Sequence, residues 1–81
     1  MTILRYKDIA KDYKIPRGSC YESQYKGLLP LPIKIGQRSV GFIKEEIEQV
    51  IKLRIAGGSD EQVKALVRKI HAARKTAGQA V

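Results

Sequence analysis

Two groups of basic and polar residues carry the chemistry that this sequence offers. Arginine and lysine bind phosphate oxygens through charge-assisted hydrogen bonds, and hydroxyl and carboxylate groups can exchange hydrogen bonds with the edges of bases. The first group lies in a short predicted helix and the second at a predicted turn. These residue types suit the surface of a nucleic acid. The candidate DNA-binding residues are Arg17, Ser19, Tyr21, Glu22, Ser23 and Lys26 in the helix, and Lys34, Gln37 and Arg38 at the turn.

The sequence shows no arrangement that is typical of an enzyme or a metal site. The single histidine, His71, lies in a basic segment without a neighbouring nucleophile or carboxylate, so we expect an exposed helix histidine. Cys20, the single cysteine, is expected to be a small core residue. Gly57-Gly58 lacks the surrounding pattern of a phosphate-binding loop. We therefore expect no catalytic residue, no metal and no cofactor.

The charge of the chain favours a polyanionic partner. The 81 residues include 16 Lys and Arg against 8 Asp and Glu, which gives a net charge of +8. Such a field attracts nucleic acid, although a basic soluble protein of another kind has the same composition. The length fits one domain. Neither a membrane-spanning apolar run nor a signal-peptide pattern is present, so we expect a cytoplasmic protein.

Two short helices separated by a break are predicted in the N-terminal third. Tyr6, Ile9, Ala10 and Tyr13 share one helical face, which predicts a helix over 6–13. Pro16 breaks this helix and is well placed to begin another. The second helix is expected to run to Tyr25 or Lys26 and to stop at Gly27.

The second helix has one inward and one outward face. On a helical wheel the outward face carries the polar and basic side chains, with Arg17 at its N-terminal end. This pattern is typical of the recognition helix of a helix–turn–helix motif, although any small helical hairpin offers similar spacing. The inward face comprises Gly18, Cys20, Tyr21, Gln24 and Tyr25, and the outward face comprises Ser19, Glu22, Ser23 and Lys26.

A β-hairpin is predicted after an extended connector over 28–32, in which two prolines exclude a helix. The strands are expected at 33–35 and 40–43, with Gly36 supplying a positive φ at the turn. Arg38 would then project from the tip toward a phosphate group or a narrow minor groove; the alternative is a solvated turn arginine. Core contacts are expected from Ile33, Ile35, Phe42, Ile47 and Ile51.

Two further helices are predicted after the hairpin. The third begins near Lys44 and ends at 56–58, and its expected buried stripe is Ile43, Ile47, Val50, Ile51 and Ile55. Ser59 and Gln62 have the spacing of a capping box for the fourth. Its stripe of Val63, Leu66, Val67 and Ile70 would either cover the third helix at Leu53 or form a dimer, and 76–81 are expected to be a frayed tail.

The segment IPRGSCYESQYKGLLPLPIKIGQRSVGFIKEEIEQVIKLR resembles the AlpA-like phage and prophage regulators, a winged-helix group related to excisionases and MerR-type domains. The resemblance covers about residues 3 to 55. The chain departs from the family pattern at Pro16, Gly18, Glu22, Phe42 and Val50. The matching residues are Arg17, Ser19, Tyr21, Gly27, Pro30, Pro32, Lys34, Gly36, Arg38, Gly41, Glu46, Ile47 and Arg54.

The resemblance implies a regulator that acts by binding double-stranded DNA. The expected fold is mainly α with a small β-hairpin: a winged helix–turn–helix domain over 1–56, followed by an amphipathic basic helix and short tail over 57–81. An excisionase-like factor that bends DNA is one alternative, and an RNA-binding or protein-interaction module is another. A homodimer and contacts with transcription or recombination proteins are further expectations. The inward placement expected for Phe42 and most tyrosines argues against stacking on RNA bases.

Overall fold

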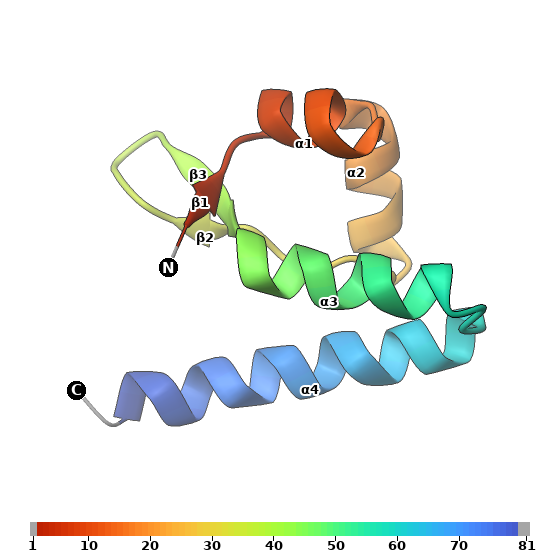
Figure 1. Ribbon diagram of the computed structural model, residues 1–81. Helices are drawn as coiled ribbons and strands as arrows, with labels where there is room; N and C mark the ends of the chain where they lie inside the picture. The colour runs from red at the N-terminus through yellow and green to blue at the C-terminus, as the bar shows by residue number, and fades with distance from the viewer. Residues whose placement is uncertain (1, 80–81) are drawn as a thin grey trace.

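The computed structural model describes residues 2–79 and contains four helices and a small antiparallel sheet in that range (Figure 1). This mainly helical architecture confirms the predicted winged helix–turn–helix class. The elements in chain order are β1 (Ile3–Leu4), α1 (Tyr6–Tyr13), α2 (Arg17–Tyr25), β2 (Ile33–Lys34), β3 (Val40–Ile43), α3 (Lys44–Ile55) and α4 (Asp60–Gln79).

Helices α1 and α2 form the predicted helical pair. Helix α1 has the bounds that its apolar spacing predicts, and Pro16 is the N-cap of α2. Helix α2 ends at Tyr25, and Gly27 just beyond it has a φ of 76°, in the region that glycine adopts without strain. The N–H groups of Gly27 and Leu28 donate to the carbonyls of Gln24 and Ser23, which satisfies two free acceptors of the last turn.

The sheet has three strands in the order β1-β3-β2, with β3 in the centre. We did not predict β1, because two residues carry too little pattern to be distinguished from loop. Its pairing of Leu4 with Phe42 brings the start of α1 beside the hairpin. Gly41 permits this approach, because a Cβ there would overlap the side chain of Ile3. A larger residue at position 41 would therefore push β1 away from β3.

The turn between β2 and β3 differs from the expected one. Gly36 does not have a positive φ; among the described residues the glycines with positive φ are Gly27 and Gly57. The turn is wider than a two-residue turn, because the Ile35 N–H donates to the Ser39 carbonyl over 2.9 Å, and a loop of this length does not need a left-handed residue at Gly36. Ile35 lies beyond the end of β2 and is 41% exposed, so the expectation of a core contact was wrong.

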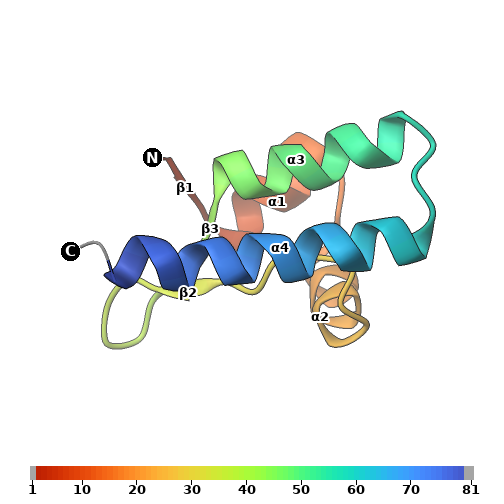
Figure 2. The ribbon, with the colours of Figure 1, turned by 90° about the horizontal axis from the view of Figure 1, so that it is seen from below.

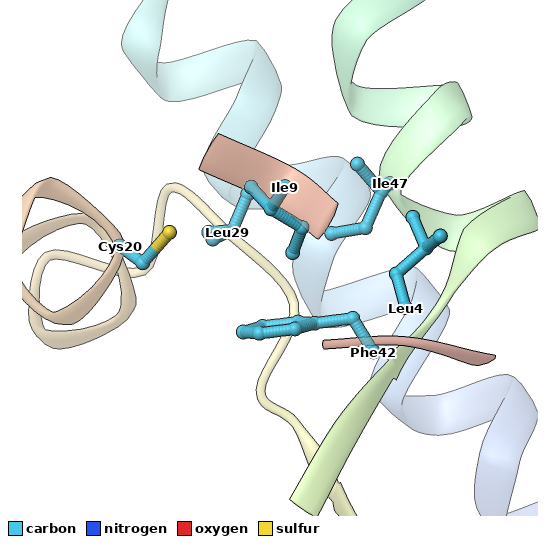
Figure 3. Close-up of a cluster of buried hydrophobic side chains, with 6 residues drawn as sticks. All are labelled: Leu4, Ile9, Cys20, Leu29, Phe42 and Ile47. Atoms are coloured by element: carbon cyan, nitrogen blue, oxygen red, sulfur yellow. The ribbon is translucent and has the colours of Figure 1, made fainter. Parts of the chain in front are cut away.

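The main hydrophobic core lies between the sheet, α1, α2 and α3. Phe42 is at its centre, where it packs with residues from five other segments (Figure 3). The Tyr6 ring contacts it edge-on, with ring centroids 5.1 Å apart. Burial raises the pKa of the Cys20 thiol, in keeping with its predicted place in the core. The buried residues of this core are Leu4, Ile9, Cys20, Leu29, Phe42 and Ile47.

Several residues that we expected to face inward are exposed. Tyr25 is 93% exposed, because it follows the buried Cys20 by five residues and so lies about 140° around the helix from it. The expectation that most tyrosines face inward was therefore wrong, because Tyr21 is also 49% exposed. Gly18, which we had placed on the same inward face, is exposed as well. Ile55 is 80% exposed because it is the last residue of α3 and lies beyond its packed turns.

Helix α4 packs along α3 and forms a second core with it. Val50 from α3 and Val63, Val67 and Ile70 from α4 are buried, and Leu53 packs against them. The apolar stripe that we considered for self-association is thus covered within the chain. Ser59 and Gln62 form the predicted capping box. The predicted frayed tail was wrong over 76–79, since α4 continues to Gln79; 80–81 lie outside the described residues.

A polar cluster joins α4 to α3 and to the connector before β2. The two nitrogens Nε and Nη2 of Arg74 donate to the two carboxylate oxygens of the buried Glu46, with Nε 2.9 Å from Oε2. Nη2 also donates to the Leu31 carbonyl over 2.7 Å. The Leu31 N–H donates to Nε2 of His71 over 3.1 Å. His71 is thus a partly buried acceptor and not the exposed histidine that we expected.

His71 is expected to make the stability of the protein depend on pH. Burial first, and then the neighbouring Arg74 charge, lower its pKa below the usual 6.5, while Glu46 opposes this shift. The unfolded chain therefore binds more protons near that pH, so the free energy of unfolding should fall as the pH decreases through and below 6.5. Urea unfolding at pH values above and below 6.5 would measure this decrease in the free energy of unfolding. A His71→Gln variant, which retains an acceptor but does not titrate, should lose this part of the dependence; an unchanged dependence would contradict the prediction.

Candidate nucleic-acid interface

Helix α2 and the turn between β2 and β3 protrude on the same side of the molecule (Figure 2). Eight of the nine candidate DNA-binding residues are exposed, and Ser23 is partly buried. Those on α2 are held at the surface because Cys20 anchors the opposite side of the helix in the core. The candidates therefore form two separate exposed groups, one on α2 and one on the hairpin.

Arg17 is oriented by two aromatic rings at the beginning of α2. Its guanidinium carbon lies 4.9 Å from the Tyr6 ring centroid and 5.7 Å from that of Tyr21. Its Nε donates to the Tyr21 hydroxyl over 3.2 Å. Cation–π contacts of this kind hold a guanidinium in place without neutralising its charge. The terminal nitrogens of Arg17 are thus free to bind an anion, and the Tyr21 hydroxyl helps to orient this side chain.

Glu22 and Lys26 pair with each other on the exposed side of α2. The Lys26 Nζ is 2.8 Å from Glu22 Oε1, and the two residues are one helical turn apart. The hydrogen bond and charge of Lys26 lower the pKa of the Glu22 carboxyl. Exposed pairs of this kind are weak and can be exchanged for other partners. In the free protein, the negative charge of Glu22 and the positive charge of Lys26 therefore offset each other on the exposed side of α2.

A basic cleft separates the start of α2 from the hairpin turn. It has a volume of about 370 Å³ and is lined by Arg5, Tyr6, Lys7, Arg17, Arg38, Ser39 and Val40. Arg17 and Arg38, which are far apart in the sequence, thus line one cleft. Lys34 and Gln37 are not among its lining residues. We did not predict Arg5 and Lys7 as site residues. The sequence feature that could have indicated them is their position on either side of the aromatic Tyr6 at the start of α1.

Within residues 2–79, no group of three or more His, Cys, Asp or Glu side chains has an arrangement that could hold a metal ion. None of the helices in that range combines the length and apolar composition needed to cross a membrane.

The family model for the prophage CP4-57 regulatory protein (AlpA) matches residues 2–55. That segment contains the whole sheet, helices α1 to α3 and all nine candidate residues, whereas α4 follows it. No curated protein and no solved structure matches the chain. The match covers about two thirds of the sequence, and the fold has the helix–turn–helix and hairpin that the resemblance implied. The chain therefore belongs to the AlpA family of prophage regulatory proteins, which is a DNA-binding family.

Proposed function

We propose that this protein is a sequence-specific transcription regulator of phage or prophage type that binds double-stranded DNA through α2 and the hairpin turn. Helix α2 would enter the major groove, where Ser19, Glu22 and Ser23 contact base edges. Arg17 and Arg38 would bind the adjacent backbone. The observation that supports this proposal best is the projection of both elements from one side of the molecule, each with exposed basic residues (Figure 2).

The salt bridge between Glu22 and Lys26 suggests how base contacts would form on binding. A DNA phosphate near Lys26 would compete for its ammonium group, and the Glu22 carboxylate would then be released to accept from a cytosine amine. Since the exposed pair contributes little to stability, its exchange costs the protein little. Gln37 and Lys34 would follow the backbone from the hairpin. Sequence preference would thus come from α2, and most of the salt dependence from the arginines and lysines.

Arg38→Ala is expected to weaken DNA binding similarly on all sequences. An arginine that contacts only phosphate carries no base information, so the slope of log affinity against log salt should decrease by about one unit. Fluorescence anisotropy on a selected and an unrelated duplex, at several salt concentrations, measures both the affinity and the salt slope. Lys69→Ala, which removes the same charge from the α3–α4 side of the molecule, is the matched control. Equal affinity and slope for wild type and Arg38→Ala would remove Arg38 from the interface.

Selection of bound sites from random duplexes, with RNA as a parallel target, tests the proposed function as a whole. Enrichment of one duplex sequence supports the regulator, and preference for RNA would contradict it; the exposure of Tyr25 makes this comparison necessary because exposed aromatics can stack on unpaired bases. The gel mobility of the protein–DNA complex, measured with the selected site at different positions in a longer fragment, then reports whether the protein bends DNA. A strong bend would favour the excisionase-like alternative, and its absence favours transcription regulation.

A further inference from the structure

The cleft between α2 and the hairpin concentrates positive charge contributed by three segments. Its seven described lining residues include four cationic side chains and no acidic one. Arg5 and Lys7 come from the beginning of α1, Arg17 from α2, and Arg38 from the turn. Among the ion pairs of the described residues, none involves any of these four. Four like charges around one cleft repel one another, so an anion bound there would relieve that repulsion.

The backbone holds these residues in place independently of any ligand. Pairing of β1 with β3 places Arg5 directly after a strand that is fixed to the hairpin. The Arg5 N–H donates to Asp8 Oδ2 over 2.8 Å, so the carboxylate of Asp8 accepts a hydrogen bond from the backbone at the start of α1. Tyr6 packs on Phe42 in the core and on the guanidinium of Arg17 at the surface. The Arg5 backbone and the Arg17 guanidinium are therefore held in place before an anion binds, which lowers the entropic cost of binding.

We propose that this cleft binds one phosphate group of the DNA backbone, with Arg5 and Lys7 as contact residues alongside Arg17 and Arg38. The inference rests on the proposed function, because the cleft lies between the two elements assigned to DNA. A phosphate held there would fix α2 and the hairpin in one register on the same strand. Hydroxyl and guanidinium donors around an open polar cleft suit the anionic oxygens of a phosphodiester and not the apolar face of a base.

The test compares wild type with the double variant Arg5→Gln/Lys7→Gln on the selected duplex. We expect an affinity loss of about tenfold, because two charge-assisted hydrogen bonds are removed, and a salt slope lower by about one unit. Preference between duplex sequences should remain unchanged. Both residues are exposed, so the variant should have the melting temperature of wild type, and Arg68→Gln/Lys69→Gln, which removes two exposed charges from α4, controls for net charge. Unchanged affinity and slope in a wild type that binds duplex would overturn this inference and leave the proposed function intact.

Neutral methylphosphonate groups placed singly along the duplex locate the phosphate. One position should weaken wild type but should have little further effect on the double variant, because the same contact has already been lost. Equal additional weakening at every position would contradict a shared site. Titration of labelled protein with inorganic phosphate, without DNA, tests whether the cleft instead binds free phosphate. If wild type binds phosphate tightly and saturably while the double variant keeps its affinity for DNA, the assignment of the cleft to the DNA backbone would be overturned. Failure of wild type to bind any duplex would instead overturn the proposed function.

Discussion

Phe42→Ala is expected to lower the free energy of unfolding by about 3–5 kcal/mol, a range typical of large-to-small aromatic substitutions in a core. Phe42 is fully buried, and its removal would leave a cavity bounded by the sheet and three helices (Figure 3). The edge-on contact with Tyr6 would also be lost. A domain of this length has a total stability of about 4–12 kcal/mol. The variant would therefore retain only part of its stability, or be largely unfolded at room temperature.

Urea unfolding followed by circular dichroism measures the effect, with two matched variants. Phe42→Leu retains much of the volume and should lose distinctly less stability. Ile55→Ala removes an apolar side chain that is mostly exposed and should change the free energy of unfolding by less than about 0.5 kcal/mol. A loss below about 1 kcal/mol for Phe42→Ala would mean that this residue is not central to the core.

The core reaches the proposed DNA interface through one aromatic residue. Tyr6 has Phe42 on one side and Arg17 on the other, and its hydroxyl accepts a hydrogen bond from Gln24 of α2 over 3.3 Å. Burial raises the pKa of Tyr6, and the hydrogen bond from Gln24 opposes this shift. A loss of packing at Phe42 would thus also loosen the support of the Arg17 guanidinium. We therefore expect stability and the proposed DNA binding to be linked through the contacts of Tyr6.

The sequence predicted the elements whose pattern is local. Tyr6 to Tyr13 form a helix with the expected bounds because four apolar residues repeat at helical spacing. The capping pair Ser59 and Gln62 marked the start of α4 because both donors and acceptors lie within one turn. Burial was predicted less reliably: Tyr25 lies about 140° around α2 from the buried Cys20, and Ile55 lies at the end of α3, beyond its packed turns.

The features that could not be predicted depend on contacts between distant segments. Strand β1 exists because the narrow Gly41 admits it beside β3, and only that pairing brings Arg5 to the basic cleft. Arg17 and Arg38 were recognised by residue type and family resemblance, but their shared cleft follows from the tertiary fold. His71 likewise seemed exposed because its partner, the Leu31 backbone, is 40 positions away in the sequence. Local periodicity contains no information on such pairs.

The ion pair of Arg74 with Glu46 belongs to the same class of distant contact, and Arg74→Ala should lower the free energy of unfolding by about 2–4 kcal/mol. Removing one partner of a buried pair typically costs about 3–5 kcal/mol, because the other charge remains buried without compensation. The side chains of Arg74 and Glu46 are 23% and 11% exposed, so we expect a somewhat smaller effect. The Leu31 carbonyl would lose its donor as well.

Four variants would separate this ion pair from general effects at the surface of α4. Arg74→Lys retains the charge but cannot form the two-pronged contact, so an intermediate loss is expected. Glu46→Ala/Arg74→Ala should lose less stability than the sum of the two single variants, since neither charge is left alone. Arg68→Ala, on an exposed position of the same helix, should change stability by less than about 0.5 kcal/mol. If Arg74→Ala is equally benign, the pair is not a significant contribution to the fold.

The position of Arg74 makes the outcome informative about the family as well as the fold. The family match ends at residue 55, yet Glu46 within the matched segment has its charge partner in α4, at position 74. A chain without α4 would lose the ion pair between Arg74 and Glu46 and would expose the apolar side chain of Val50. We therefore expect the matched segment of this protein to depend on α4 for stability, so that the interface on α2 and the hairpin is fully formed only in the longer chain.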